Sequence, residues 1–183
     1  MSKVIIAGDV NGTGVFTIAA PNGNTNRTLT LPDSAGTILT TATAGVPIGG
    51  PAFSAYQSSA QTLSSGTHTK LQFQTEEFDT ANAFDSSTNY RFTPNVAGYY
   101  QVNGCFAVNV SVTQMQVVVN KNGAQAKSGG NLTGAGQLSG SALIFLNGST
   151  DYVELYGWIA SGQALVPTAI STYFQAALVR SAT

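Results

Sequence analysis

Short runs of β-branched and aromatic residues, separated by turn-forming residues, are the feature that most constrains this sequence. The pairs Asn122-Gly123 and Asn147-Gly148 suit tight turns, because both residue types accept positive φ at low cost. Ser, Thr, Gly and Asn interrupt every window in which apolar residues could repeat with helical spacing. The sequence therefore predicts an all-β fold, an antiparallel sandwich, barrel or jelly roll. The expected strands lie at residues 69–73, 90–93, 99–110, 115–120, 138–146, 151–159 and 172–179.

The composition changes at residues 41–50, where Gly, Pro, Thr and Ala dominate without periodicity, as is typical of a linker. This linker separates an arm, residues 1–40, from a larger head, residues 51–183. We expect the arm to be β-rich, with short strands at 15–19, 28–31 and 37–40. So little apolar surface forms no stable core of its own. The arm is therefore expected to pair with copies of itself, to pack on the head, or to dock into a larger assembly.

Two of the expected strands are apolar on both faces, namely residues 115–120 (MQVVVN) and 142–146 (ALIFL). In a two-layer antiparallel sandwich, one face of each strand is normally polar. The second face is covered either by a loop of the same chain or by another subunit. We favour another subunit, because burial of a large apolar face against a copy of the chain is typical of obligate oligomers.

The charge content is low, with 8% charged residues and a net charge of −1, against about 25% charged residues in an average domain. Nucleic acids and anionic membranes bind clustered Lys and Arg, and the basic residues here are scattered. No run approaches the roughly 20 apolar residues of a membrane span. We expect no nucleic-acid partner and no membrane insertion. The N-terminus lacks the apolar core of a secretion signal, so we expect synthesis in a cytoplasm.

Residues able to carry catalysis are scarce. His68, the only histidine, lies in a polar stretch, and the chain has no Gly-x-Ser-x-Gly nucleophile motif. One histidine and one cysteine are too few for a zinc site. Glu76 and Glu77 would point to opposite faces of a strand, so they cannot act as a pair in glycoside cleavage. Cys105 lies in an apolar run, which predicts a buried, unreactive thiol. We expect no enzyme activity, no catalytic residue and no cofactor.

One group of polar residues leaves an alternative open. Asp79, Asn82 and Asp85 could offer oxygen ligands to Ca²⁺, although their spacing is not that of an EF-hand loop. A polar loop explains these residues without a metal, and no metal site is predicted.

Three aromatic residues leave a second alternative open. Tyr152, Tyr156 and Trp158 could line a sugar-binding surface, because aromatic rings pack well on apolar surfaces. Packing in the core or at a subunit interface is the favoured interpretation of the same residues.

The order of landmarks in residues 51–183 resembles the globular heads of the complement and tumour necrosis factor superfamily. An opening run, AFSAY, precedes TKLQF at 69–73. The stretch NYRFTPNVAGYYQV at 89–102 is similar to the family's Phe-x-x-Pro and Gly-Tyr-Tyr. VVVNKNG at 117–123 resembles a family hairpin, and TYFQAALV at 172–179 resembles the closing strand beside the family's trimer axis. The resemblance implies a homotrimeric antiparallel jelly-roll sandwich.

The same resemblance gives the aromatic stretch a role. Pro94 and Gly98 would turn the chain between two adjacent strands. Large apolar side chains of several strands would then fill the core and the trimer interface. These side chains are Phe92, Tyr99, Tyr100, Val117, Val119, Phe145, Tyr173 and Phe174.

The arm is similar to short segments that precede the heads of bacteriophage tail fibres and other virion appendages. Its pattern includes GTGVFTIAAP, TLTLP and AGTILT. Together with the head, this resemblance implies a non-enzymatic trimeric virion protein, a short tail or head fibre made in the host cytoplasm. Residues 1–40 would bind other virion proteins, and the head would bind a host surface glycan or protein. The long polar stretches 56–68 and 127–138 are the candidate contact loops.

Two further functions stay open from the sequence. A capsid decoration protein would stabilise a shell by bridging its subunits. A free jelly-roll lectin would bind carbohydrate as an independent module, and it would need a secretion signal that the sequence does not show. A depolymerase is disfavoured, because the carboxylates do not pair.

Overall fold

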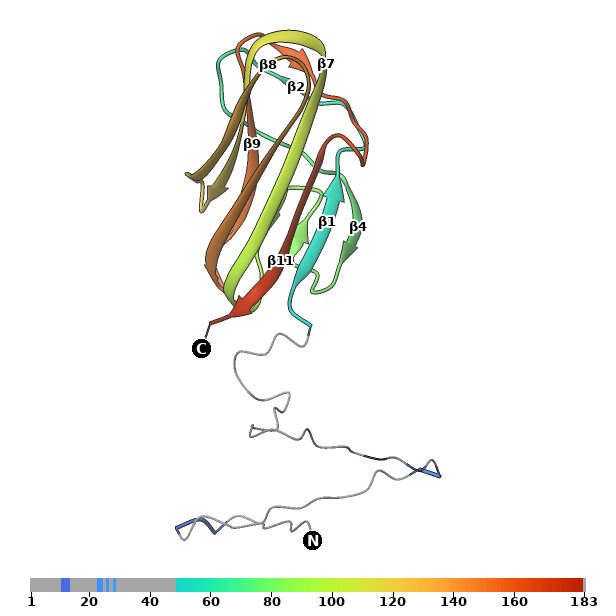
Figure 1. The fold of residues 1–183 in the computed structure, drawn as a ribbon, viewed down its shortest axis with the longest axis vertical. Coiled ribbons are helices and arrows are strands. Elements are labelled where there is room, and N and C mark those ends of the chain that lie inside the picture. Colours follow the sequence, from blue (N-terminus) through green and yellow to red (C-terminus); the bar gives the residue numbers. More distant parts are fainter. Residues whose placement is uncertain (1–10, 14–22, 25, 27, 29–48, 183) are drawn as a thin grey trace, which may run out of the picture. The chain divides into compact units, whose positions relative to one another are not determined.

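The computed structural model describes residues 11–13, 23–24, 26, 28 and 49–182 (Figure 1). The strands expected in the arm, at 15–19, 28–31 and 37–40, lie almost wholly outside the described residues. All secondary structure described below belongs to the head. The described residues include no helix of the length and apolarity that a bilayer crossing requires.

The head is built of antiparallel β-strands, as the sequence predicts. Its described residues form β1 (Ala52–Tyr56), β2 (Thr62–Leu63), β3 (Thr69–Lys70), β4 (Thr75–Asp79), β5 (Phe84–Asp85), β6 (Arg91–Phe92), β7 (Ala97–Lys121), β8 (Ala124–Asn147), β9 (Val153–Ile159), β10 (Gln163–Ala164) and β11 (Tyr173–Ser181).

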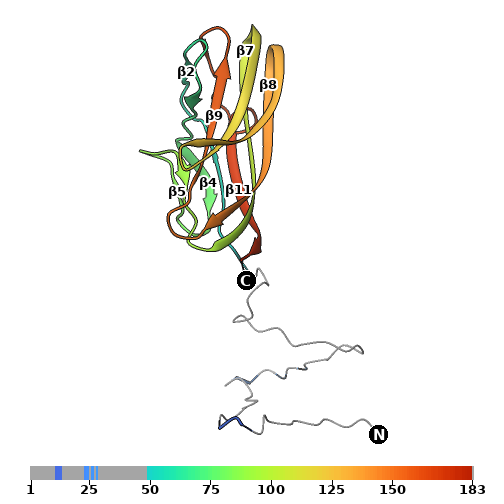
Figure 2. The same cartoon turned by 90° about the vertical axis from the view of Figure 1, so that its left-hand side faces the viewer.

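The two longest strands, β7 and β8, run through both layers of the sandwich (Figures 1 and 2). The first half of β7 lies between β11 and the second half of β8, in a layer that continues through β1 to β4. The second half of β7 lies between β9 and the first half of β8, in a layer that also holds β3, β5 and β6. Register shifts between Val108 and Met115 mark the bend that joins the layers. This arrangement is a jelly-roll sandwich.

Aromatic side chains fill the core between the layers. The Phe53 ring stacks on the rings of Phe84 and Phe92, at centroid distances of 4.4 and 4.7 Å, and meets Phe174 edge-on at 5.0 Å. Tyr100 packs edge-on against Phe92 at 5.6 Å and is fully buried. Truncating a core Phe to Ala typically costs about 3–5 kcal/mol. The aromatic cluster therefore contributes strongly to the stability of the fold.

Burial also fixes the hydroxyl of Tyr100. This hydroxyl donates a hydrogen bond to the Val96 carbonyl oxygen at 2.7 Å, and desolvation raises the pKa of Tyr100 to about 12. The bond ties the start of β7 to the turn that precedes it. Pro94 and Gly98, the predicted turn residues, are both buried on either side of Val96.

Both turn pairs predicted from the sequence are confirmed. Asn122 and Gly123 have φ of 52° and 81°, the left-handed values that a two-residue hairpin between β7 and β8 requires. Gly148 has φ of 72°, and a Cβ there would lie 2.3 Å from the Ala97 nitrogen. The close approach of the backbone therefore makes glycine necessary at position 148.

Two predictions about strand boundaries are wrong. Residues 99–110 and 115–120 belong to one strand, β7, and the expected contact loop at 127–138 lies within β8. Gly and Ser have low intrinsic strand propensity, which suggested a loop. In the structure, this segment is held by hydrogen bonds to the Val-rich second half of β7. Pairing with a strong partner strand outweighs the local composition.

The second apolar face of residues 115–120 is covered by the chain itself, contrary to the favoured expectation. Val117 and Val119 point into the core. Val118 points the other way, yet only 1% of its surface is exposed. It lies between Tyr156 of β9 and Ser128 of β8 in the sheet register. Residues 142–146 differ, because their second face is exposed.

Candidate subunit interface

The outer surface of the layer built on β11, β7 and β8 carries four of the seven exposed large hydrophobic residues among those described. Side chains alternate along these strands, so residues next to buried positions point outward. Tyr100 and Ile144 face the core, whereas their neighbours Tyr99 and Phe145 face outward and pair directly across the strands. We call this surface the β11–β7–β8 face. It comprises Tyr99, Gln101, Asn103, Cys105, Ser139, Ser141, Leu143, Phe145, Tyr173, Gln175, Ala177 and Val179.

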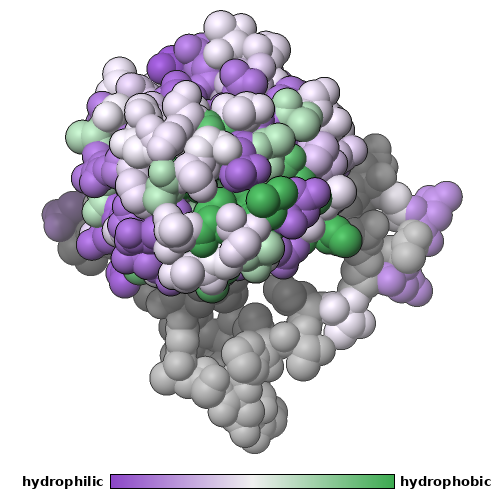
Figure 3. Space-filling view, turned by 90° about the horizontal axis from the view of Figure 1, so that it is seen from above, coloured by the Kyte–Doolittle hydropathy of each residue, from purple (hydrophilic) through white to green (hydrophobic). Residues whose placement is uncertain are grey.

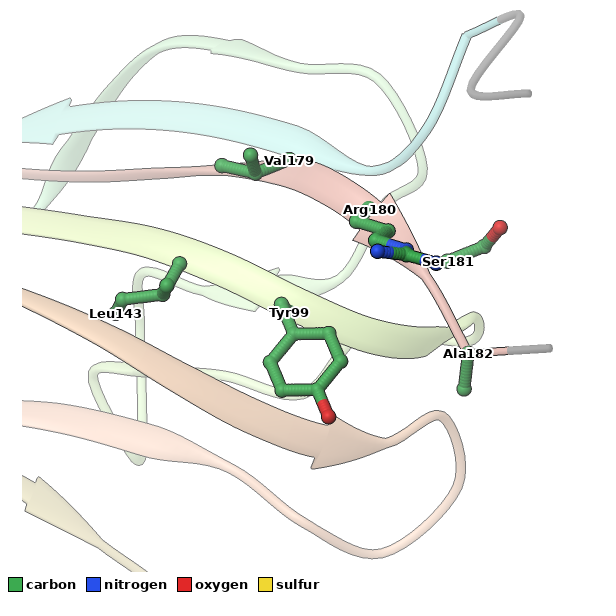
Figure 4. Close-up of a pocket in the computed structure, with 6 residues that line it drawn as sticks. All are labelled: Tyr99, Leu143, Val179, Arg180, Ser181 and Ala182. Carbon is green, nitrogen blue, oxygen red and sulfur yellow. The ribbon is translucent and has the colours of Figure 1, made fainter. Parts of the chain in front are cut away.

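One end of the β11–β7–β8 face is apolar. Tyr99, Leu143, Phe145 and Val179 are 44%, 55%, 41% and 54% exposed. The Tyr99 and Phe145 rings meet edge-on, with centroids 5.5 Å apart. Figure 4 shows Tyr99, Leu143 and Val179 on three neighbouring strands. These residues line a hollow of about 520 Å³. A contiguous exposed group of this kind on a folded domain commonly marks an interaction surface.

The middle of the same face is polar and internally hydrogen-bonded. Gln101 Nε2 donates to Ser141 Oγ at 2.7 Å, and Ser141 Oγ donates to Asn103 Oδ1 at 2.9 Å. At the strand edge, Ser54 Oγ donates to Glu77 Oε2 at 2.7 Å. These bonds hold the amide groups in place before any partner binds.

Cys105 lies on the β11–β7–β8 face beside Tyr173. Only 3% of its surface is exposed, so the predicted burial of the thiol is confirmed. Burial raises the pKa of the Cys105 thiol above its usual value, and burial likewise raises the pKa of Tyr173. A thiol with a raised pKa holds little of the reactive thiolate at neutral pH.

The residues predicted for the core or trimer interface fall into three groups. Tyr99 and Phe145 are exposed on the β11–β7–β8 face, and Tyr173 is half-buried on the same face. The remaining five have their side chains in the core of the chain. These five are Phe92, Tyr100, Val117, Val119 and Phe174.

Sequence reasoning missed Val179 of the apolar end and its neighbour Arg180. Val179 lies at a register shift near the end of β11, and Arg180 pairs with Tyr99 beyond that shift. Val179 ends the apolar run AALV, and the register shift that leaves its side chain exposed has no signal in the sequence. The signal for Leu143 was present, since it belongs to the run that is apolar on both faces.

The carboxylates considered for Ca²⁺ accept hydrogen bonds from the backbone. Asp79 accepts the amide N–H groups of Ala81, Ala83 and Phe84. Asp85 accepts bonds within its own loop from three successive amides, at residues 87–89. Within the part of the chain that the structure describes, no three His, Cys, Asp or Glu side chains are grouped to hold a metal ion.

The end of the head at the bend of β7 and β8 also exposes apolar residues. Figure 3 shows hydrophobic residues near the centre of this end, with hydrophilic residues around them. Ile170 is 83% exposed there, in a loop fixed by the Thr172 hydroxyl, which donates to the Val166 carbonyl oxygen at 2.7 Å. Gln137 Nε2 donates to the Ile170 carbonyl oxygen at 3.2 Å. This loop is therefore held in shape with its apolar tip in solvent.

Comparison with known proteins gives structural neighbours only. No family model and no curated protein matches the sequence. Murine APRIL matches with a TM-score of 0.58 and 10% identity, over 70% of this chain and 98% of APRIL. The globular domain of zebrafish complement 1qA matches with a TM-score of 0.53 and 18% identity, over 72% of this chain and 99% of that domain.

A third neighbour is Eiger TNF from S. frugiperda, with a TM-score of 0.56 and 10% identity, over 73% of this chain and 96% of that protein. Identities this low establish the fold alone. The chain therefore has the jelly-roll fold of the tumour necrosis factor and complement globular heads.

Proposed function

We propose that the protein is a non-enzymatic homotrimer that displays a jelly-roll recognition head on a bacteriophage virion. The observation that carries the trimer is the exposed apolar end of the β11–β7–β8 face. Its four large side chains stay in water when the chain is alone. Burying apolar surface yields about 25 cal/mol per Å², so association through this face is favourable.

A closed ring of three subunits is compatible with the residues of this face. Cyclic assembly lets one surface of each subunit contact a different surface of the next, and three subunits complete the ring. Apolar residues at one end of the face supply binding energy, and the fixed amides of Gln101 and Asn103 add polar contacts. The resemblance of the head to trimeric heads, stated above from its sequence landmarks, points to the same assembly.

Replacing Leu143 with Asp tests the trimer. The wild-type protein is expected to sediment as a trimer at low micromolar concentration. Leu143→Asp places one carboxylate per subunit in the apolar end, and burial of unpaired charges costs several kcal/mol. We therefore expect the variant to sediment as a monomer with an unchanged far-UV circular dichroism spectrum.

Ala126→Asp is the matched control, because Ala126 is exposed on β8 but belongs to the other layer. This variant is expected to remain a trimer. A wild-type protein that stays monomeric, or a Leu143→Asp variant that stays trimeric, contradicts the proposal.

The virion assignment is supported by the similarity of the arm to segments of phage appendage proteins. It is tested by mass spectrometry of purified particles, in which the protein is expected at a copy number divisible by three. Separating tails from capsids then distinguishes a fibre from a decoration protein. Recovery from the soluble lysate alone contradicts the assignment and favours the free lectin.

A further inference from the structure

The outer surface of the second layer carries aromatic residues of β9. Val153, Leu155 and Ile159 point into the core, so the residues between them point outward. Tyr156 and Trp158 are half-buried there, and Tyr152 precedes them on the same side. We call this surface the β9 strip. It comprises Tyr152, Tyr156 and Trp158, with His68, Gln116 and Ser128 beside them.

A row of polar groups lies next to the Trp158 indole. Gln116 pairs with Trp158 in the register of β7 and β9. Its Oε1 lies 3.2 Å from His68 Nε2, and its Nε2 donates to Ser128 Oγ at 2.8 Å. The His68 ring centroid lies 6.4 Å from that of Trp158. The amide is thus fixed at both ends beside an aromatic ring.

One ion pair and one further cation lie near the β9 strip. Glu154 is 2% exposed and forms an ion pair with Lys70, whose Nζ also donates to the Asn89 carbonyl oxygen. The Arg91 guanidinium lies 4.4 Å from the centroid of the Tyr152 ring. The Glu154 carboxylate is buried against Lys70 and is not presented to a ligand on this surface, which is therefore suited to binding rather than cleavage.

We propose that the β9 strip binds neutral hexopyranose units of a surface polysaccharide. A pyranose ring has an apolar C–H face, which packs on aromatic rings, and hydroxyls at its rim, which exchange hydrogen bonds with fixed amides. Lys70 and Glu154 neutralise each other, which leaves Arg91 as a single cation at the strip, whereas a polyanion is bound by clustered cations. This proposal rests on the proposed function, because it names the class of ligand that the displayed recognition head binds.

A protein partner is less well matched to this strip. The strongly exposed large hydrophobic residues among those described lie elsewhere: Phe78, Tyr99, Val110, Leu143, Phe145, Ile170 and Val179. The β9 strip belongs to the layer opposite the β11–β7–β8 face, so it is a separate surface of the head. Three linked weak sites bind a repetitive polysaccharide about 10²–10⁴-fold more tightly than one site alone.

Trp158 provides a direct readout, since it is the only tryptophan of the chain. The full-length protein is titrated with cellohexaose, maltohexaose and mannohexaose while its fluorescence and the heat of binding are recorded. We expect at least one of these neutral oligosaccharides to bind and to change the Trp158 emission with the same midpoint in both measurements.

Gln116→Ala retains the reporter and removes the fixed amide, so it is expected to weaken binding by about tenfold. Gln137→Ala is the matched control, because it removes another hydrogen-bonded glutamine that belongs to neither the β9 strip nor the β11–β7–β8 face. It is expected to bind as the wild type does. Near-UV circular dichroism verifies that both variants fold.

The proposal is overturned if no probe binds, if binding heat appears without a Trp158 response, or if Gln137→Ala weakens binding as much as Gln116→Ala. Capture of host cells that persists after their polysaccharide is removed also overturns it, in favour of a protein partner. Sedimentation of the same samples reports the trimer separately. A monomer that still binds sugar would contradict the assembly and leave the β9 strip intact.

Discussion

At the scale of single residues, Asp85 organises the loop between β5 and β6. Its carboxylate accepts the N–H groups of Ser87, Thr88 and Asn89, and also the Asn89 side-chain amide at 2.7 Å. The backbone hydrogen bond from Thr88 is the largest of the effects that hold the pKa of Asp85 well below its usual range. The charged form is therefore the one that stabilises the loop.

Replacing Asp85 with Asn tests this role through pH. At pH 7, we expect the free energy of unfolding to fall by about 1–2 kcal/mol, the cost of weakening a capping carboxylate. The folded pKa is depressed, so the stabilisation is present above the unfolded pKa of about 3.9 and is lost as pH falls toward the folded pKa. The difference from the wild type is therefore expected to shrink below about pH 4 in chemical denaturation.

The matched control is Glu76→Gln, because the Glu76 side chain accepts a single hydrogen bond, from Ser86 Oγ, on an exposed strand. We expect little change in stability from this variant. A difference in unfolding free energy between Asp85→Asn and the wild type that stays constant from pH 7 to pH 3 would contradict the role of the Asp85 charge.

Single residues also show what the sequence could not resolve. Asp79 and Asp85 were recognisable as loop residues with free oxygen ligands, but their partners are backbone N–H groups, which the sequence does not distinguish. Tyr99 and Tyr100 are adjacent and of the same type. Strand alternation predicts that they face opposite ways, and only the packed structure shows that Tyr100 is the buried one.

At the scale of elements, two glycines bring the halves of β8 together where the sandwich closes. A Cβ at Gly129 would lie 2.5 Å from Val117 Cγ1 and 3.2 Å from the Gly140 Cα. A Cβ at Gly140 would lie 2.9 Å from the same Val117 methyl. Val117 is fully buried, so its methyl group has no free space to move into.

Replacing Gly129 with Ala is expected to destabilise the head by about 1–3 kcal/mol through overpacking. In the double variant Gly129→Ala/Val117→Ala, the clash with the Val117 methyl group is absent. The losses of unfolding free energy caused by the two single changes are therefore expected to be less than additive by at least about 0.5 kcal/mol. Urea denaturation of the wild type, the two single variants and the double variant measures this coupling.

Gly130→Ala is the control, because its Cβ would meet only Leu138 Cδ1, at 4.0 Å. It is expected to be close to neutral. Strict additivity between positions 129 and 117 would show that the close approach does not limit packing there.

Elements were predictable where local chemistry decides them. The hairpin at Asn122-Gly123 and the strand β9 follow from turn residues and alternation. The first half of β8 was not predictable, because its Gly and Ser residues become a strand only by pairing with β7. β4 was also missed, since its sequence TEEFD carries little apolar pattern and it pairs at the sheet edge with β1.

At the scale of the whole molecule, stability is expected to depend on protein concentration. If three subunits bury the β11–β7–β8 face, dissociation accompanies unfolding, and mass action raises the melting temperature as concentration rises. Calorimetry over a hundredfold range of concentration is expected to show this rise for the wild type and not for Leu143→Asp. A melting temperature independent of concentration in the wild type would contradict an assembly that unfolds as it dissociates.

The layered fold of the head could be inferred from ordered sequence landmarks, and the structural neighbours confirm it. The candidate interface could be inferred only in part. Residues 142–146 are apolar on both faces in the sequence, whereas the contributions of Val179 and Arg180 depend on the register shift in β11. Residues 115–120 have the same apolar pattern and are covered within the chain.

The first and last strands of the head are antiparallel neighbours, with Ala52 beside Ala177. The Leu178 N–H donates to the Pro51 carbonyl oxygen, and the Ala182 N–H donates to that of Ala97. The polypeptide therefore enters and leaves the head at one pole, away from the bend of β7 and β8. A fluorescent reporter or affinity label genetically appended behind residue 183 would emerge at that pole and leave the opposite pole bare.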